Sequence, residues 1–205
     1  MYHSNLNLST ENQTPKTEIM RAFIAIALNQ ELHTDILLLQ RRLDKYDLAI
    51  RWVNPTNMHL TLQFLGDINN QELKTILSSL ADAVNSHQSF SLSLSGIGVF
   101  PDLCCPRVMW AGIEKGKKEC ISLQKDIEGS VNRIKVKKEN RTFSPHLTIG
   151  RFITKNHKPD IGRIIEKERN FHLKALAPVN AIMLFESILT PKGAIHKIVE
   201  KFPLR

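Results

Sequence analysis

Two tetrapeptides of this 205-residue chain nearly repeat each other: residues 59–62 read His-Leu-Thr-Leu and residues 146–149 read His-Leu-Thr-Ile. Both alternate a polar with an apolar residue, which is the pattern of a half-buried β-strand. In an extended strand, His and Thr lie on one face while the two apolar residues face a core. The repeat therefore predicts two equivalent strands, each presenting an imidazole beside a hydroxyl group.

The composition is that of a globular protein, with 42% apolar and 23% charged residues. A net charge of +8 favours anionic partners such as nucleic acid or phosphorylated substrates, although it equally suits a protein that is merely soluble. The apolar runs are much shorter than the roughly 18 residues that span a bilayer, so we expect no membrane partner. Three cysteines, two of them adjacent, fit neither a disulfide framework nor a four-ligand zinc site, and we expect a reducing, cytoplasmic location.

The first residues of the chain differ in composition from the rest. Residues 1–18 are rich in Asn, Ser, Thr and Gln, and they lack the basic start and apolar stretch of a secretion signal. An apolar, β-rich run begins directly after Met20. We therefore expect residues 1–19 to be a disordered extension that precedes the folded domain.

Strand and helix patterns alternate along the remaining chain. Apolar residues at helical spacing predict helices over residues 30–46, 69–86, about 118–134 and, more weakly, 159–168. Strands are predicted at residues 21–28, 58–65, 90–94, 107–113, 146–153, 171–176, 179–189 and 195–202, with Gly66 ending the second and with 90–94 and 107–113 as antiparallel neighbours. Each motif histidine follows a proline-containing loop, which indicates two related lobes that each contribute a central strand to a cleft.

The motif residues suit phosphodiester chemistry without a metal ion. Two histidines on opposite walls of a cleft, His59 and His146, can act as general acid and general base because an imidazole titrates near neutral pH. Thr61 and Thr148 can donate hydrogen bonds to the non-bridging oxygens of a phosphate held between them. A metal site at the two histidines would lack a third ligand at a recognisable spacing, so we expect no metal and no cofactor. For either motif alone, a structural histidine beside a strand-forming threonine remains an alternative.

The two motifs and their flanking stretches resemble the two-histidine phosphoesterase superfamily, and in particular its RNA 2′,3′-cyclic phosphodiesterase branch, also called 2′-5′ RNA ligase. The matching stretches lie at residues 20–26, 51–53, 59–66, 96–101, 106–112, 143–151 and 184–187. They occur in the family's order over residues 20–205. One departure is Gln63, which stands where the family often has Lys and is expected to weaken the attraction of phosphate.

This resemblance implies an α+β fold for residues 20–205: a single bilobal, pseudo-symmetric domain in which two antiparallel sheets flank a central groove, with helices on the outside. It implies hydrolysis of the terminal 2′,3′-cyclic phosphate of RNA to a 2′-phosphate, together with reversible 2′-5′ RNA ligation. In the family, the histidine at the position of His59 donates a proton to the leaving 3′ oxygen and that at His146 activates water, roles that the sequence itself does not assign.

Arg151 matches the family's arginine just past the second motif and is expected to bind the phosphate end of the substrate. It lies five residues after His146, an odd offset that places it on the opposite face of an ideal strand. A β-bulge, or the end of the strand, is therefore needed to bring its guanidinium group to the histidine face.

Other readings of the same residues remain open. The chain can be an RNA-binding module without turnover, or it can act on a small cyclic nucleotide or a 2′-5′ linked oligonucleotide, since the four motif side chains contact only phosphate. A basic stretch at residues 133–141 can steer RNA toward the groove or be a solvated loop. The six other histidines are interpreted as surface or structural residues. We expect a monomer with no obligate protein partner, because one chain supplies both motif histidines.

Overall fold

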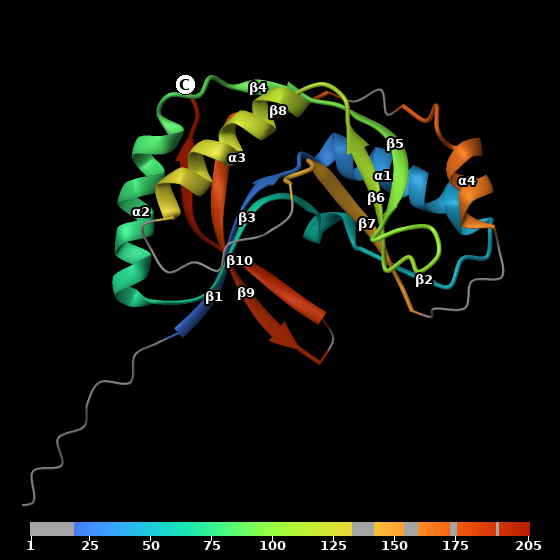
Figure 1. Ribbon diagram of the computed structural model, residues 1–205, viewed down its shortest axis with the longest axis horizontal. Coiled ribbons are helices and arrows are strands. Elements are labelled where there is room, and N and C mark those ends of the chain that lie inside the picture. Colours follow the sequence, from blue (N-terminus) through green and yellow to red (C-terminus); the bar gives the residue numbers. More distant parts are fainter. Residues whose placement is uncertain (1–18, 133–141, 154–159, 173–175, 192) are drawn as a thin grey trace, which may run out of the picture.

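The computed structural model describes residues 19–132, 142–153, 160–172, 176–191 and 193–205 (Figure 1). The strands are β1 (Ile19–Ala27), β2 (Ile50–Trp52), β3 (His59–Asn69), β4 (Phe90–Leu92), β5 (Leu94–Phe100), β6 (Val108–Ile113), β7 (His146–Phe152), β8 (Ala177–Val179), β9 (Ala181–Thr190) and β10 (Gly193–Pro203). The helices are α1 (Gln30–Asp44), α2 (Asn70–Val84), α3 (Lys117–Val131) and α4 (Ile161–Lys167), with a short 3-10 helix at Pro55–Asn57. Residues 1–18 of the predicted extension and the basic stretch 133–141 lie outside the described residues.

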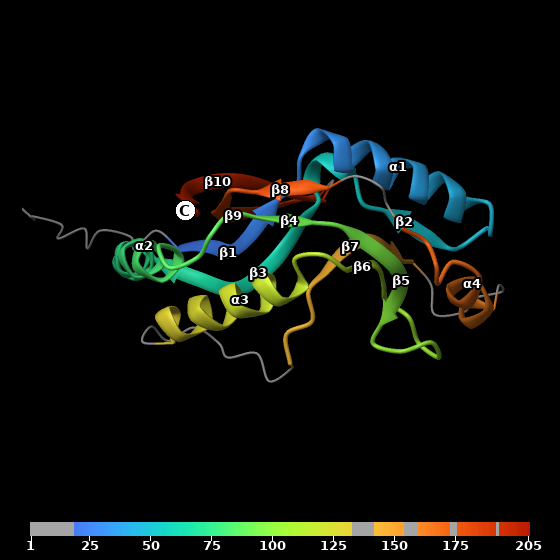
Figure 2. The same ribbon diagram turned by 90° about the horizontal axis from the view of Figure 1, so that it is seen from above.

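The strands form two four-stranded sheets and one two-stranded ribbon, and every described pairing is antiparallel. The first sheet has the order β10-β9-β1-β3, the second has the order β2-β7-β6-β5, and β4 pairs with β8. Helices α2 and α3 pack against the first sheet, whereas α1 and α4 lie beside the second (Figures 1 and 2). The predicted α+β class with antiparallel sheets is confirmed.

The two lobes are not the two halves of the chain. Strand β2 precedes β3 in the sequence but pairs with β7 in the second sheet, and α3 follows β6 of the second sheet but packs against β3 of the first. One cluster of buried apolar side chains contains residues of both sheets, including Leu60 of β3 and Leu147 of β7. Because the chain crosses repeatedly between the sheets, they share a core.

The helices form where apolar spacing and N-terminal capping agree. Asn29 caps α1 by accepting a hydrogen bond from the Leu32 backbone, and Asn69 forms a reciprocal capping box with Glu72 at the start of α2. The apolar faces of the first three helices are buried against the sheets. All four predicted helices are present, with ends within a few residues of the predicted positions.

Several strand predictions are wrong in detail. Gly66 does not end β3, because it takes a positive φ of 74° within the strand, which continues to Asn69. The stretch 90–94 is divided between two partners: β4 pairs with β8, and only from Leu94 does β5 pair with β6. Strand β3 lies at the end of its sheet's order, so it is not a central strand, whereas β7 is an inner strand.

Two boundaries also differ from the predictions. Residues 173–175 of the strand predicted at 171–176 lie outside the described residues; of the remainder, His172 makes an isolated bridge to Ser95, and β8 begins at Ala177. Strand β1 begins at Ile19, one residue inside the predicted extension. None of the described helices has the length and apolar character needed to span a membrane.

Candidate active site

A β-bulge lies at the last residue of the motif in strand β7. Thr148 pairs with Trp110 and Gly150 pairs with Met109, so Ile149 is an extra residue between them. The extra residue shifts the alternation of the strand by one position. Arg151, five residues after His146, therefore returns to the face that carries His146, as the sequence required.

Strand β3 has the same irregularity at the equivalent place. Thr61 pairs with Ala25 and Gln63 pairs with Ile24, which leaves Leu62 as the extra residue. The residue equivalent to Arg151 is Phe64, which is 53% exposed. The motif repeat therefore extends to the bulges, but it places an aromatic ring in one lobe where the other has a guanidinium group.

We call the face of β3 and β7 that carries His59, Thr61, His146 and Thr148 the motif face. All four of these residues are half-buried. The intervening apolar residues, Leu60, Leu62, Leu147 and Ile149, are buried, with exposures of 0–3%. The predicted division of each motif into a polar face and a core face is therefore present in both strands.

A buried glutamine of α1 holds the β7 bulge. The side-chain nitrogen Nε2 of Gln40 donates hydrogen bonds to the carbonyl oxygens of Ile149, at 2.9 Å, and of Val53, at 2.7 Å. The Val53 backbone N–H also donates to the Ile149 carbonyl oxygen, at 3.0 Å. Gln40 is only 5% exposed, so these bonds replace water at backbone groups that the bulge removes from the regular ladder.

Both motif histidines are oriented in the same way. The Nδ1 atom of His59 lies 3.0 Å from the Asn57 carbonyl oxygen, and that of His146 lies 2.7 Å from the Ser144 carbonyl oxygen. A carbonyl oxygen only accepts, so each Nδ1 carries the hydrogen and each Nε2 is free to take or give a proton. Within the described part of the chain, the hydroxyl groups of Thr61 and Thr148 make no hydrogen bond. Each motif strand thus offers one imidazole nitrogen and one unused hydroxyl donor.

Aromatic rings pack around both histidines. The ring of His59 lies 4.6 Å from Phe23 and 4.9 Å from His196, measured between ring centroids. The ring of His146 lies 4.9 Å from Phe100 and 6.4 Å from Trp110. These contacts restrict the rotation of both imidazoles, which favours a fixed direction for the reactive nitrogens.

His196 of β10 is a residue that the sequence interpretation missed. The sequence gives it a surface or structural role because no motif surrounds it, yet its ring makes an edge contact with His59 and another with Phe23. Strand β10 was predicted, but the sequence does not show which residues of a distant strand lie beside a motif. The other described histidines fit the structural reading: His87 pairs with Asp126 at 2.9 Å, for example.

Electrostatic interactions link residues of the two motif strands. Burial, aided by positive charge on His196 and Arg151, lowers the pKa of His59 to about 4, against the opposing effect of the hydrogen bond to Asn57. Arg151 belongs to the second sheet and His59 to the first, so its guanidinium group acts across the two lobes. Residues of β3 and β7 also contact each other directly.

Gln63 does not have the effect expected of it. This residue is 6% exposed, its Nε2 donates to the Phe64 carbonyl oxygen, and its Oε1 accepts from Gln124 of α3 at 3.4 Å. The side chain is directed toward α3, so the absence of Lys here does not remove a cation from the motif face.

Among the described residues, no three His, Cys, Asp or Glu side chains are close enough to hold a metal ion. The three cysteines are free, and burial raises the pKa of Cys120 to about 12.

The fold and the motif strands together define a class of protein: an α+β molecule in which two antiparallel sheets each present a His-x-Thr motif. Residues 26–110 match the family model described as LigT like Phosphoesterase. A protein of Aquifex aeolicus named RNA 2′,3′-cyclic phosphodiesterase is 32% identical over 191 residues, covering 91% of this chain and 98% of the relative. One of the same name from Methanothermobacter thermautotrophicus is 30% identical over 90% of this chain and 99% of its own length.

Solved structures agree with this assignment. A protein of Thermus thermophilus superposes with a TM-score of 0.76 at 27% identity, covering 91% of this chain and 98% of the other. The structure of E. coli LigT complexed with 3′-AMP gives a TM-score of 0.70 at 26% identity, over 91% of this chain and 99% of that protein. The chain belongs to the LigT-like phosphoesterase family, which confirms the resemblance of its motifs.

Proposed function

We propose that this protein hydrolyses the 2′,3′-cyclic phosphate at the end of an RNA to a 2′-phosphomonoester, without a metal ion. The observation that carries the proposal is the matched orientation of His59 and His146, each with Nδ1 on a backbone carbonyl and Nε2 free. The names of the relatives support the substrate class. The net charge of +8 suits an anionic polymer.

In the proposed reaction, Nε2 of His146 takes a proton from water as the water oxygen attacks phosphorus. The bond between phosphorus and the 3′ oxygen breaks, and Nε2 of His59 gives its proton to that oxygen. Thr61 and Thr148 donate hydrogen bonds to the non-bridging oxygens, and Arg151 neutralises the charge that develops on them. When the 5′ hydroxyl of a second RNA takes the place of water, the same bond between phosphorus and the 3′ oxygen breaks, and the product is a 2′-5′ ligated RNA.

His59 must be protonated to donate a proton to the 3′ oxygen, and its low pKa makes this depend on the bound substrate. With a pKa of about 4, its imidazole is neutral at pH 7 in the free protein. A cyclic phosphate held beside it brings a negative charge, which favours the protonated imidazole. The proton that His59 delivers is therefore taken up together with the substrate.

We further propose that residues 20–205 act as one domain and as a monomer in the cytoplasm. Both motif strands come from a single chain and contact each other, so no second copy is needed to complete the site.

The test uses a short RNA that ends in a 2′,3′-cyclic phosphate, incubated with the protein in excess EDTA. We expect a 2′-phosphate product, identified by isomer-resolving chromatography and mass spectrometry, at a rate that EDTA does not change. A rate that EDTA abolishes and a divalent metal restores would contradict the metal-free mechanism. Salt-sensitive RNA binding without product would favour the alternative of a binding module.

A further inference from the structure

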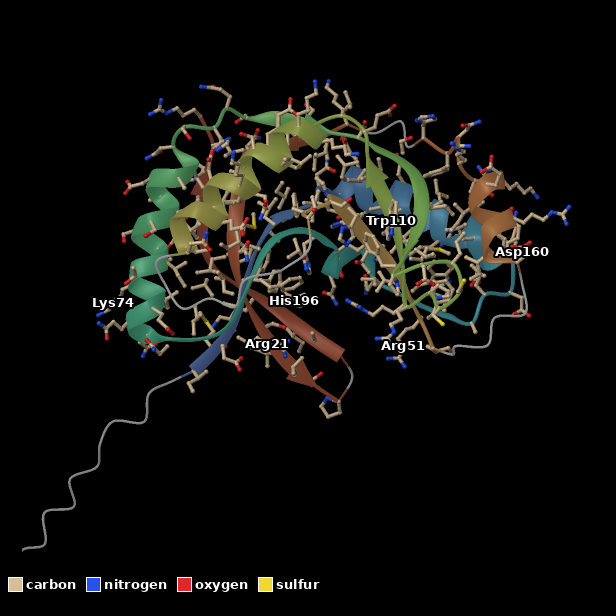
Figure 3. The ribbon with its side chains drawn as sticks, in the orientation of Figure 1. Arg21, Arg51, Lys74, Trp110, Asp160 and His196 are labelled. Carbon is tan, nitrogen blue, oxygen red and sulfur yellow. The ribbon has the colours of Figure 1, made fainter. Side chains whose placement is uncertain are left out.

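Two arginines lie side by side at the Arg151 end of the motif face. In the pairing of β2 with β7, Arg51 is directly opposite Arg151. Directly opposite residues of an antiparallel pair point to the same face, with Cβ atoms about 5 Å apart. The bulge at Ile149 places Arg151 on the motif face, so Arg51 lies on this face too, on the edge strand of the sheet. Figure 3 shows Arg51 on the second sheet.

This pair of like charges has no neutralising partner in the described part of the chain. Both side chains are exposed, and neither guanidinium group has an ion pair or hydrogen bond to a described residue. Two of the other described arginines do have carboxylate partners: Arg42 pairs with Glu168 and Arg169 with Glu166. Like charges placed directly opposite in a sheet are destabilising, which is the situation expected where a bound anion supplies the missing charge.

The surface beside the pair has room for such an anion. A depression of about 330 Å³ is lined by Arg51, Arg151, Phe152 and Ile153. It lies at the end of β7 beyond the motif residues, so a group bound there does not occupy the place between the histidines. Two guanidinium groups at its wall offer parallel N–H donors, the arrangement that matches phosphate oxygens.

We propose that Arg51, together with Arg151, forms a second phosphate subsite that holds the internucleotide phosphate on the 5′ side of the terminal cyclic phosphate. This inference rests on the proposed function and narrows its substrate. Arg151 stands between the two phosphates, and Arg51 contacts only the outer one. A cyclic mononucleotide with a free 5′ hydroxyl lacks that phosphate, so the subsite makes the protein select an RNA end.

The test compares two substrates that differ by one nucleotide, and therefore by the internucleotide phosphate that it brings: adenosine 2′,3′-cyclic phosphate and the dinucleotide ApA ending in a 2′,3′-cyclic phosphate. We expect Arg51→Gln to raise KM for the dinucleotide about tenfold more than KM for the mononucleotide, the loss typical of one charge-assisted hydrogen bond. Arg51→Lys, which keeps the charge, should restore part of the difference. Arg41→Gln, an exposed arginine of α1, is the matched control and should change neither value.

Two other results would overturn the subsite. Equal effects of Arg51→Gln on the two KM values would mean that Arg51 acts at the cyclic phosphate or only stabilises the fold. No effect on either KM would mean that Arg51 does not bind the substrate.

If the unmodified protein hydrolyses neither substrate, the proposed function fails, and a binding measurement then tests the subsite alone. For ApA carrying a terminal 2′-phosphate, the slope of log K against log salt should fall by about 0.7 in Arg51→Gln, the value for one phosphate contact on a single strand. An unchanged slope would refute the subsite.

Discussion

The substitution Gln40→Met tests whether the β7 bulge depends on one buried side chain. Methionine keeps the volume of glutamine and removes both N–H donors from the carbonyl oxygens of Ile149 and Val53. The Ile149 oxygen keeps its bond from the Val53 N–H, so one carbonyl, that of Val53, loses the only partner it has among the described residues. A partly buried carbonyl left without a partner costs about 1–3 kcal/mol and the second lost bond about 1 kcal/mol, so we expect a loss of about 2–4 kcal/mol in unfolding free energy.

Urea unfolding followed by circular dichroism measures this loss, and Tm should fall by roughly 5–15 °C for a chain of this size. The relaxed bulge should also withdraw Arg151 from the motif face and raise KM for a cyclic phosphate substrate. Gln124→Met is the matched control, since among the described residues the Gln124 amide donates to side chains alone, those of Gln63 and Glu128. If Gln40→Met changes the unfolding free energy by less than about 1 kcal/mol, or lowers it while KM stays unchanged, the role given to Gln40 is refuted.

Two further predictions concern a titration and an ion pair whose carboxylate is buried while its arginine is half-exposed. NMR titration should show His59 neutral from pH 7 to pH 5 with a midpoint near pH 4, and His196→Gln should move that midpoint upward by removing a neighbouring positive charge. Because the unfolded chain takes up this proton near pH 6.5 and the folded chain does not, stability should fall as pH is lowered from 6.5 toward 4; a midpoint near 6.5 in the folded protein would contradict the burial of His59. Arg42→Met should cost about 3 kcal/mol in urea unfolding, because it leaves Glu168, only 2% exposed, without its cation at 2.8 Å. Arg42→Met combined with Glu168→Gln should recover part of that loss, and no loss in the single variant would show that the pair is not needed.

The local features of the site follow from the sequence more readily than its long-range contacts. Alternating residues predict both motif strands, and because a strand has a strict period of two, the odd offset of Arg151 from His146 predicts either a bulge or the end of the strand, of which the structure has the bulge. The support of that bulge could not be predicted, since Gln40 lies 109 residues from Ile149 and reads as one polar position in a helix.

His196 illustrates the same limit. Its strand was predicted, but its contact with His59 depends on how the β9–β10 hairpin pairs with β1 within the first sheet. Periodicity describes one segment at a time, whereas this contact joins segments that are distant in the chain. The repeated crossing of the chain between the two sheets could not be predicted for the same reason. Strands β2 and β3 are consecutive in the sequence, yet they belong to different sheets.

The most direct test of the central claim is kcat/KM for an RNA ending in a 2′,3′-cyclic phosphate, measured for His59→Ala, His146→Ala and the double variant. If the two imidazoles transfer protons in one reaction, each single variant should lose about 10²–10⁴-fold, and the double variant should lose far less than the product of the two. His87→Ala, whose ring pairs with Asp126 away from the motif strands, should keep full activity. A single variant, at either motif position, that retains activity within about tenfold of the unmodified protein would contradict the account.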